Sequence, residues 1–210
     1  GIQGYTVQKL SSDPTVEEAV GQLWYNSSTG KFKVATQSAG TWAAGGTMNN
    51  ARYELAGCGL QTAGLVFGGS TPVKNETEKY DGTSWTEVAN LNLARSQLAG
   101  AGTNTAGLAL GGNVPPAASG WKDETETWDG TSWAEVADLN QGRSALAGAG
   151  ITTAALAMGG NYPNTAYVGL VETWDGTSWT EVADLNTDRA YAQAATQGTP
   201  TASLVFGGHT

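Results

Sequence analysis

The stretch Asp129-Gly-Thr-Ser-Trp133 recurs at Asp81–Trp85 and at Asp175–Trp179, and a shortened version ends at Trp42. Successive tryptophans of these copies lie 43, 48 and 46 residues apart. An arginine follows ten residues after each tryptophan, at Arg52, Arg95, Arg143 and Arg189. A Gly-Gly pair ends an apolar run in each copy, at Gly68–Gly69, Gly111–Gly112, Gly159–Gly160 and Gly207–Gly208. The chain is therefore built from one unit that repeats about every 45 residues.

Each unit predicts four short β-strands. A small-residue run such as 98–102 comes first, an apolar run ending in Gly-Gly second, and Glu-Thr-Trp at 172–174 exemplifies the third. The Asp175-Gly176 pair that follows predicts a type I′ hairpin into a fourth strand, which begins at the tryptophan. A period of this length is typical of propeller blades rather than of leucine-rich or ankyrin units. We therefore expect an all-β propeller, with Ala- and Gly-rich first strands at the crowded axis and the tryptophans on the outer strands.

Counting strands predicts three complete blades, which begin near Arg52, Arg95 and Arg143. The stretch 189–210 supplies only the first two strands of another blade, while 21–46 supplies outer strands. Joined, the two stretches would make a fourth blade and close the ring, which would remove exposed sheet edges. Two alternatives stay open: the ends pair with another chain, or a longer parent protein continues past the C-terminus.

The repeat resembles the kelch repeat. The resemblance rests on the arginine, the small-residue strand, the apolar strand ending in Gly-Gly, the aromatic residue before Asp-Gly, and a Trp six residues before a Leu, and it covers roughly residues 40–210. It implies a propeller of four-stranded blades, although kelch propellers usually have five to seven blades and this chain holds fewer.

Residues 1–20 precede the repeats and are expected to form an extended leader or tether, while 21–210 form the propeller. The pattern Gln22-Leu-Trp-Tyr-Asn26 followed by Thr29-Gly-Lys31, with a hairpin turn at 28–30, is similar to segments of tailed-phage fibres and other virion appendages. The near-identical DGTSWTEVA segments are similar to those of marine-phage structural proteins. This resemblance implies a virion or extracellular location.

Charge and composition narrow the classes of partner. The chain has 10 basic and 19 acidic residues and a net charge of −9, so neither nucleic acid nor an anionic membrane surface is an expected partner. No apolar run approaches the ~18 residues that a membrane-spanning helix needs. The one cysteine, Cys58, excludes an intrachain disulfide framework and is expected to be a small buried residue.

Catalysis has little support in the sequence. The single histidine is His209, so we expect neither a Ser-His-Asp triad nor a histidine metal site, and no metal or cofactor. The repeated glutamates are expected to be solvated strand positions; they are Glu78, Glu126, Glu172, Glu87, Glu135 and Glu181. A glycan-processing enzyme is accordingly the least favoured function.

One type of loop absorbs all the length differences between the repeats. The loops between Gly-Gly and the third strand, at 70–77, 113–125 and 161–171, hold 8, 13 and 11 residues. Topology places them at the end where the first strands begin, beside the arginines. Loops that vary on a constant scaffold commonly carry binding residues.

The candidate ligand-binding residues are therefore the arginines and the loop aromatics: Arg52, Arg95, Arg143, Arg189, Trp121, Tyr162 and Tyr167. In kelch-type adaptors, arginines at such strand starts bind acidic peptides, so the resemblance implies carboxylate recognition. The structural alternative is that each arginine pairs with carbonyls or with nearby acidic residues. The aromatics either stack on sugar rings or pack as local loop cores. Asparagines three residues before the arginines, Asn92, Asn140 and Asn186, are expected to be turn formers.

These observations favour a non-enzymatic virion structural or attachment protein, a binding or decoration module on a phage particle or tail fibre. Its expected partners are other virion proteins or sister subunits, reached through the N-terminal segment, and a host surface glycan or protein. The alternative is a kelch interaction module that captures an acidic peptide.

Overall fold

The computed structural model describes residues 8–11, 23–34, 44–115, 120–162, 167–195 and 199–210. The described residues form β-strands, turns and loops without helices, so the all-β prediction is confirmed. The chain divides into two compact units, Gly1–Ala44 and Gly45–Thr210.

The smaller unit holds one three-stranded sheet, in which β1 (Gln8–Leu10) pairs in parallel with β2 (Leu23–Asn26), and β2 pairs antiparallel with β3 (Lys31–Val34). The predicted hairpin turn is present between β2 and β3. The Asn26 side-chain oxygen accepts the backbone N–H groups of Ser28 and Thr29, each at 3.0 Å, and Gly30 takes a φ of 69°.

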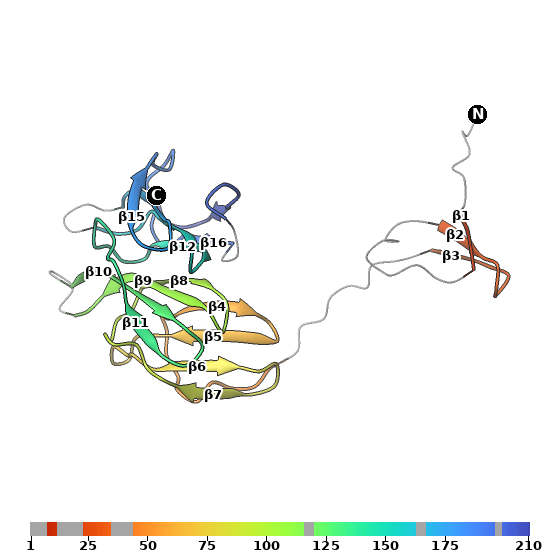
Figure 1. Ribbon diagram of the computed structural model, residues 1–210, viewed down its shortest axis with the longest axis horizontal. Helices are drawn as coiled ribbons and strands as arrows, with labels where there is room; N and C mark the ends of the chain where they lie inside the picture. Colours follow the sequence, from red (N-terminus) through yellow and green to blue (C-terminus); the bar gives the residue numbers. More distant parts are fainter. Residues whose placement is uncertain (1–7, 12–22, 35–43, 116–119, 163–166, 196–198) are drawn as a thin grey trace. The chain divides into compact units, whose positions relative to one another are not determined.

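The larger unit contains three four-stranded antiparallel sheets and one two-stranded sheet (Figure 1). The first sheet consists of β4 (Ala56–Leu60), β5 (Ala63–Phe67), β6 (Thr77–Tyr80) and β7 (Trp85–Val88). The second consists of β8 (Ala99–Gly102), β9 (Gly107–Asn113), β10 (Trp121–Trp128) and β11 (Trp133–Glu135). The third consists of β12 (Ala147–Ile151), β13 (Ala154–Met158), β14 (Val171–Trp174) and β15 (Trp179–Val182). The two-stranded sheet pairs β16 (Gln193–Ala194) with β17 (Val205–Phe206).

Strand order within each four-stranded sheet follows the chain, so the first strand forms one edge and the tryptophan strand the other. First strands of successive sheets lie side by side: β8 packs against both β4 and β12, and β12 packs against β16. Their approach is close. A Cβ added to Gly100 would lie 2.7 Å from the Gly57 carbonyl oxygen, and one added to Gly148 would lie 3.0 Å from the Gly100 oxygen. Small residues fill the first strands because no larger side chain fits between neighbouring backbones.

Apolar clusters fill the spaces between consecutive sheets. Between the first and second sheets, Phe67 meets Trp133 edge to face, with ring centroids 4.8 Å apart. The Trp133 Nε1–H donates to the Thr77 hydroxyl at 3.0 Å, and Trp179 donates to the Thr125 hydroxyl at 3.2 Å, each across to the preceding sheet. Each buried indole thus satisfies its one polar group while its ring joins two sheets.

The Asp-Gly-Thr-Ser turns join the third strand to the fourth, but the type I′ geometry predicted for them is wrong. That turn type requires positive φ at both central residues, whereas in the second sheet Gly130 alone takes it, at 100°. The Asp129 carboxylate closes the turn instead. One of its oxygens accepts the backbone N–H groups of Thr131 and Ser132, both at 2.8 Å. The aspartate side chain therefore replaces a tight two-residue turn with a four-residue one.

These hydrogen bonds make the turns sensitive to acid. Bonds from the Thr131 hydroxyl and from the Ser132 and Thr131 backbone lower the pKa of Asp129 to about 2. In the unfolded chain an aspartate titrates near pH ~3.9. The stabilisation is therefore complete above that pH and is lost as the pH falls through the folded-state pKa.

We expect the free energy of unfolding to fall more steeply on acidification in the native chain than in Asp129→Asn. The amide oxygen of that variant still accepts the turn bonds but does not titrate. Urea unfolding at a series of pH values between about 4 and 2 measures both slopes. Asp175→Asn, at the equivalent turn of the third sheet, should behave like Asp129→Asn. Identical slopes for the native chain and both variants would contradict this account.

Candidate functional site

The strand starts and the variable loops lie at the same end of each sheet, as predicted. The residue after each arginine forms a β-bridge with the residue after the Gly-Gly pair, where the variable loop begins. The pairs are Tyr53 with Ser70, Ser96 with Asn113, Ser144 with Asn161, and Ala190 with His209. The loop-bearing end of the larger unit is therefore bordered by the arginine segments.

Three of the four arginine side chains are buried in the interior. The side chains of Arg52, Arg95 and Arg143 are 0% exposed, and each forms an ion pair with a glutamate of the third strand of its own sheet. Arg95 Nη2 lies 3.1 Å from Glu126 Oε1, and Arg95 Nη1 also donates to the Glu124 carbonyl at 2.8 Å. In these three copies the arginine serves the interior, as in the structural alternative above.

The expectation that all six repeated glutamates are solvated is wrong for three of them. Glu78, Glu126 and Glu172 are at most 2% exposed, because each must neutralise the arginine buried beside it. Glu87, Glu135 and Glu181 lie opposite them on the fourth strands and are exposed.

Asparagine completes each buried pair. Asn92 donates its backbone N–H and its side-chain Nδ2 to Glu126 Oε2, at 2.8 and 2.9 Å, and Nδ2 also reaches the Trp133 carbonyl. Asn140 makes the same contacts with Glu172, and Asn49 makes them with Glu78. Asn92 and Asn140, which are expected from the sequence to form turns, thus bind buried glutamates, and Asn49 has the same role although the sequence did not single it out. In the sequence, the feature that these asparagines share is their position three residues before each buried arginine.

The fourth arginine has a different environment. Arg189 is half-buried and donates from Nη1 to the Gly207 carbonyl at 2.7 Å. Within the described ranges it has no carboxylate partner.

Burial lowers the pKa of Arg95, and the nearby carboxylate of Glu126 acts in the opposite direction. Cys58 is half-buried and its thiol donates to the Thr103 carbonyl. Burial raises the pKa of this thiol to about 12, which disfavours the thiolate form.

The three predicted loop aromatics have different surroundings. Trp121 opens β10 half-buried, and its Nε1 is buried without an acceptor in the described structure. Tyr162 and Tyr167 are also half-buried. Tyr167 stacks on His209, with centroids 6.3 Å apart, and Tyr191 meets the same imidazole edge-on at 5.7 Å. The structure thus links one predicted aromatic to two residues that sequence reasoning did not propose as ligands.

A central opening lies at the same end of the larger unit. The residue two positions after each arginine has left-handed backbone although none is glycine: Glu54, Gln97, Ala145 and Tyr191 have φ of 56°, 53°, 54° and 57°. Together with neighbouring leucines they line a cavity of about 130 Å³, which we call the mouth. The position two residues after each arginine is marked in the sequence, because it carries a different residue in every copy of the repeat.

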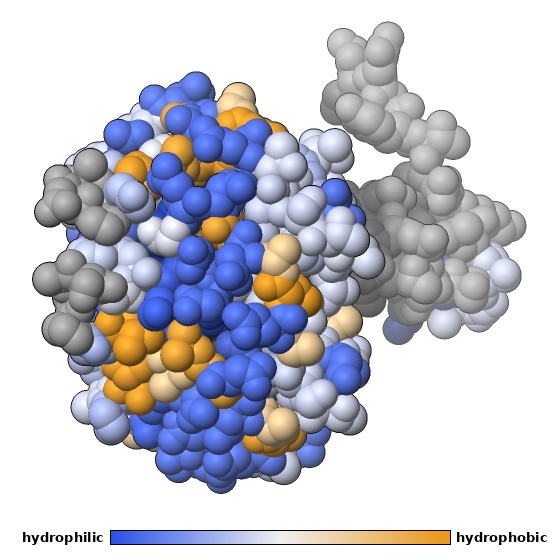
Figure 2. Space-filling model, turned by 60° about the vertical axis from the view of Figure 1, so that its left-hand side comes forward, coloured by the Kyte–Doolittle hydropathy of each residue, from blue (hydrophilic) through white to orange (hydrophobic). Residues whose placement is uncertain are grey.

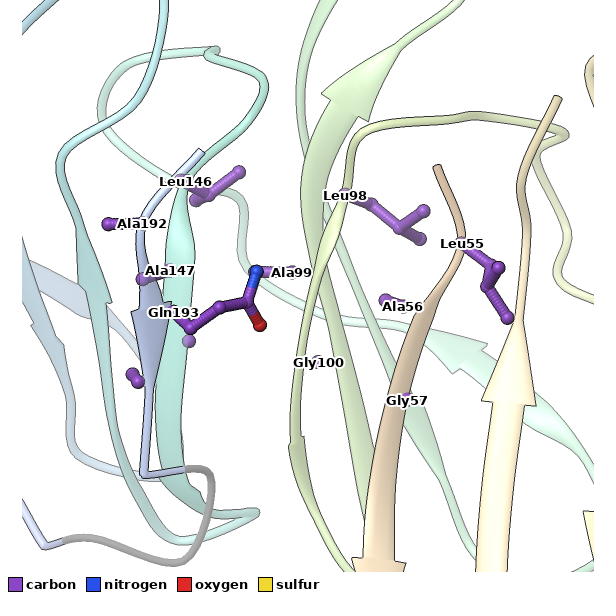
Figure 3. Close-up of a pocket in the computed structure, with 12 residues that line it drawn as sticks. Leu55, Ala56, Gly57, Leu98, Ala99, Gly100, Leu146, Ala147, Ala192 and Gln193 are labelled. Carbon is purple, nitrogen blue, oxygen red and sulfur yellow. The ribbon is translucent and has the colours of Figure 1, made fainter. Parts of the chain in front are cut away.

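The first strands line a second cavity of about 110 Å³, the channel, which shares several lining residues with the mouth. Alanines and glycines of β4, β8 and β12 line it, and Figure 3 shows Gln193 extending from β16 into the space between the strands. Gln193 replaces the alanines found at the equivalent positions Ala56, Ala99 and Ala147, so it is the one polar side chain among lining residues that are otherwise Leu, Ala and Gly.

Among the described residues, no three or more His, Cys, Asp or Glu side chains are grouped so as to hold a metal ion. No helix that could span a membrane occurs in the same residues. Neither the known protein-family models nor the curated proteins include a match to this chain.

The contribution of the buried ion pair to stability can be tested by substitution. Glu126→Ala leaves the Arg95 charge buried and unpaired, so we expect it to lower the free energy of unfolding by about 3–5 kcal/mol. Glu135→Ala is the matched control, because Glu135 lies directly opposite on β11 and is exposed. The control should change stability by at most about 0.5 kcal/mol. Chemical denaturation compares the two, and equal losses would show that the pair does not carry the stability assigned to it.

Proposed function

We propose that the chain is a kelch-like propeller of four blades that serves as a non-enzymatic attachment or decoration module of a phage particle or tail fibre. The observation that carries this proposal is the combination of uniform, ion-paired sheets with loops that vary in length at one end only. A scaffold of this kind keeps its geometry while its loops change, which suits recognition of a partner.

Two series of hydrogen bonds join successive sheets in chain order, which is an arrangement that a ring of blades requires. In the first, the second glycine of each Gly-Gly pair donates to the arginine carbonyl of the next sheet, at 2.8–3.0 Å. The bonds are Gly69 to Arg95, Gly112 to Arg143, and Gly160 to Arg189. A fourth bond, from Gly208 to Arg52, would complete the series, and it is not formed in the described residues.

The second series runs around the mouth. The backbone N–H of Gln97 donates to the Glu54 carbonyl, that of Ala145 to Gln97, and that of Tyr191 to Ala145, at 2.7–2.9 Å. A bond from Glu54 N–H to the Tyr191 carbonyl would close this series as well; the described part of the chain does not form it. Both series run through the four repeats in chain order, and closure into a ring of four blades would add these two further bonds.

The two-stranded sheet has the surface expected of an unfinished blade. Leu204 and Phe206 are 63% and 52% exposed, whereas the equivalent Leu65 and Phe67 are 0% exposed. We propose that outer strands from residues 21–46 cover these side chains and complete the fourth blade. Strands of a sister chain are the alternative source.

Closure can be tested by substitution at Phe206. If the blade is completed, Phe206→Ala should lower the free energy of unfolding of the full chain by about 3–5 kcal/mol, as for a buried phenylalanine. Leu60→Ala, at a side chain 60% exposed at the end of β4, is the control and should have little effect. Light scattering then separates the two sources of strands, because closure within one chain gives a monomer of 21.5 kDa. A loss at Phe206 no larger than at Leu60 would contradict closure.

The assignment to a virion rests on the resemblance of the N-terminal hairpin and of the repeats to phage structural proteins. Proposed partners are other virion proteins or sister subunits at the N-terminal segment, and a host surface glycan or protein at the loops. Acidic-peptide capture has less support, because three of the four arginines it would use are spent in buried ion pairs. Arg189 alone remains for that role.

Exchange of one loop tests the function. Replacing 161–170 with the shorter 70–76 should abolish binding of the labelled protein to those bacterial cells or phage particles, in a panel of both, that bind the native chain. Thr131→Ala, in a turn at the opposite end of the second sheet, should leave binding unchanged. Flow cytometry for cells and co-sedimentation for particles give the readout, with thermal unfolding as a check on the fold. A native chain that binds no cell and no particle would overturn the proposal.

A further inference from the structure

We propose that the mouth is a binding site for a neutral sugar ring, held between the Tyr191 ring and the polar side chains of Glu54 and Gln97. This inference rests on the proposed function, since it names the ligand class and the place where the loop-bearing end would take hold of a glycan. It concerns residues outside the variable loops.

The backbone at the mouth indicates a specialised position. Left-handed backbone conformation at a residue other than glycine is energetically costly and persists only where the surrounding structure imposes it. It occurs in all four copies, yet the residues are Glu54, Gln97, Ala145 and Tyr191. The repeat keeps the left-handed backbone conformation and changes the side chain. This pattern is expected where the backbone is needed for the hydrogen bonds between successive sheets and the side chains are available for a ligand.

Tyr191 provides an aromatic surface. Tyr191 is 44% exposed and lines the mouth. The imidazole of His209 abuts it at 84°, and Tyr167 stacks behind the imidazole. These contacts hold the phenol ring in one orientation, so that an apolar sugar face can pack on it at little cost in side-chain entropy.

Glu54 and Gln97 provide oriented hydrogen-bonding groups. Gln97 Nε2 donates to Glu54 Oε1 at 2.8 Å, and the Ser70 hydroxyl donates to Glu54 Oε2 at 3.1 Å. Each carboxylate oxygen keeps a further lone pair, and the Gln97 amide oxygen is a second acceptor. Gln193, which also lines the mouth, adds an amide with both donors and an acceptor. Paired donors and acceptors match hydroxyl groups, each of which donates and accepts.

The charge of the mouth selects among sugars. Among the side chains that line the mouth, Glu54 is the one carboxylate, and no Lys or Arg lies there. A sugar that carries a carboxylate would meet this charge without compensation, in a chain of net charge −9. The lining therefore fits a neutral pyranose and disfavours an acidic one.

The test is an NMR titration of the full chain with methyl α-glucoside, methyl α-mannoside and methyl β-galactoside, and with N-acetylneuraminic acid as the acidic comparison. We expect at least one neutral glycoside to shift the amide signals of Glu54, Gln97 and Tyr191. Tyr191→Ala should weaken that affinity tenfold or more. The variant is suited to folding, because Ala145 already occupies the equivalent left-handed position. Tyr53→Ala is the matched control: Tyr53 is 58% exposed and precedes Glu54 in the sequence but does not line the mouth.

Several results would overturn the inference: no shift at the mouth with any neutral glycoside, an equal response to N-acetylneuraminic acid, or an unchanged affinity in Tyr191→Ala. Displacement of the glycoside by n-butylammonium, with Glu54→Gln abolishing that displacement, would assign the mouth to a cation instead. The proposed function is judged separately by the cell and particle assay. If the loop exchange abolishes binding there while Tyr191→Ala does not, the attachment function stands and the sugar site at the mouth fails.

Discussion

A buried arginine and a buried glutamate, joined by an asparagine, organise each complete sheet of the larger unit. Arg95 enters from the segment that arrives from the previous sheet, while Glu126 stands on the third strand of the sheet that begins next. Removing two charges from water is costly unless they pair with each other. That requirement ties the crossing segment to one position on the third strand, and so sets where each first strand starts.

The contacts between successive sheets depend on where this ion pair places each first strand. Once the first strands are placed, glycine and alanine allow β4, β8 and β12 to approach closely at the centre. The sheets diverge toward their outer strands, where Trp133 and Trp179 fill the wider space and donate to threonines of the preceding sheet. The variable loops leave from the end nearest the ion pairs, so changes in their length do not disturb the packing below.

The last repeat keeps the arginine and the Gly-Gly pair but has neither the buried glutamate nor the apolar channel residue of the others. Arg189 contacts a carbonyl, and Gln193 stands where three alanines stand elsewhere. The same repeat contributes Tyr191 to the mouth. The departures from the repeat are thus concentrated in the last of the four repeats, which carries the exposed Leu204 and Phe206 and contributes Tyr191 to the proposed ligand site.

The repeats alone determined the strand content, the order of strands within each sheet, the small residues at the centre and the end from which the variable loops emerge. These features depend on local patterns that recur at one spacing, so a single sequence displays them several times. The burial of Glu78, Glu126 and Glu172 was decided only by the tertiary structure, because a glutamate in a strand reads as solvated until the arginine from a distant segment is brought beside it. The turn geometry at Asp129 and the mouth formed by Glu54, Gln97, Ala145 and Tyr191 were likewise decided in three dimensions, since side-chain capping and a shared cavity arise from contacts that sequence spacing does not specify.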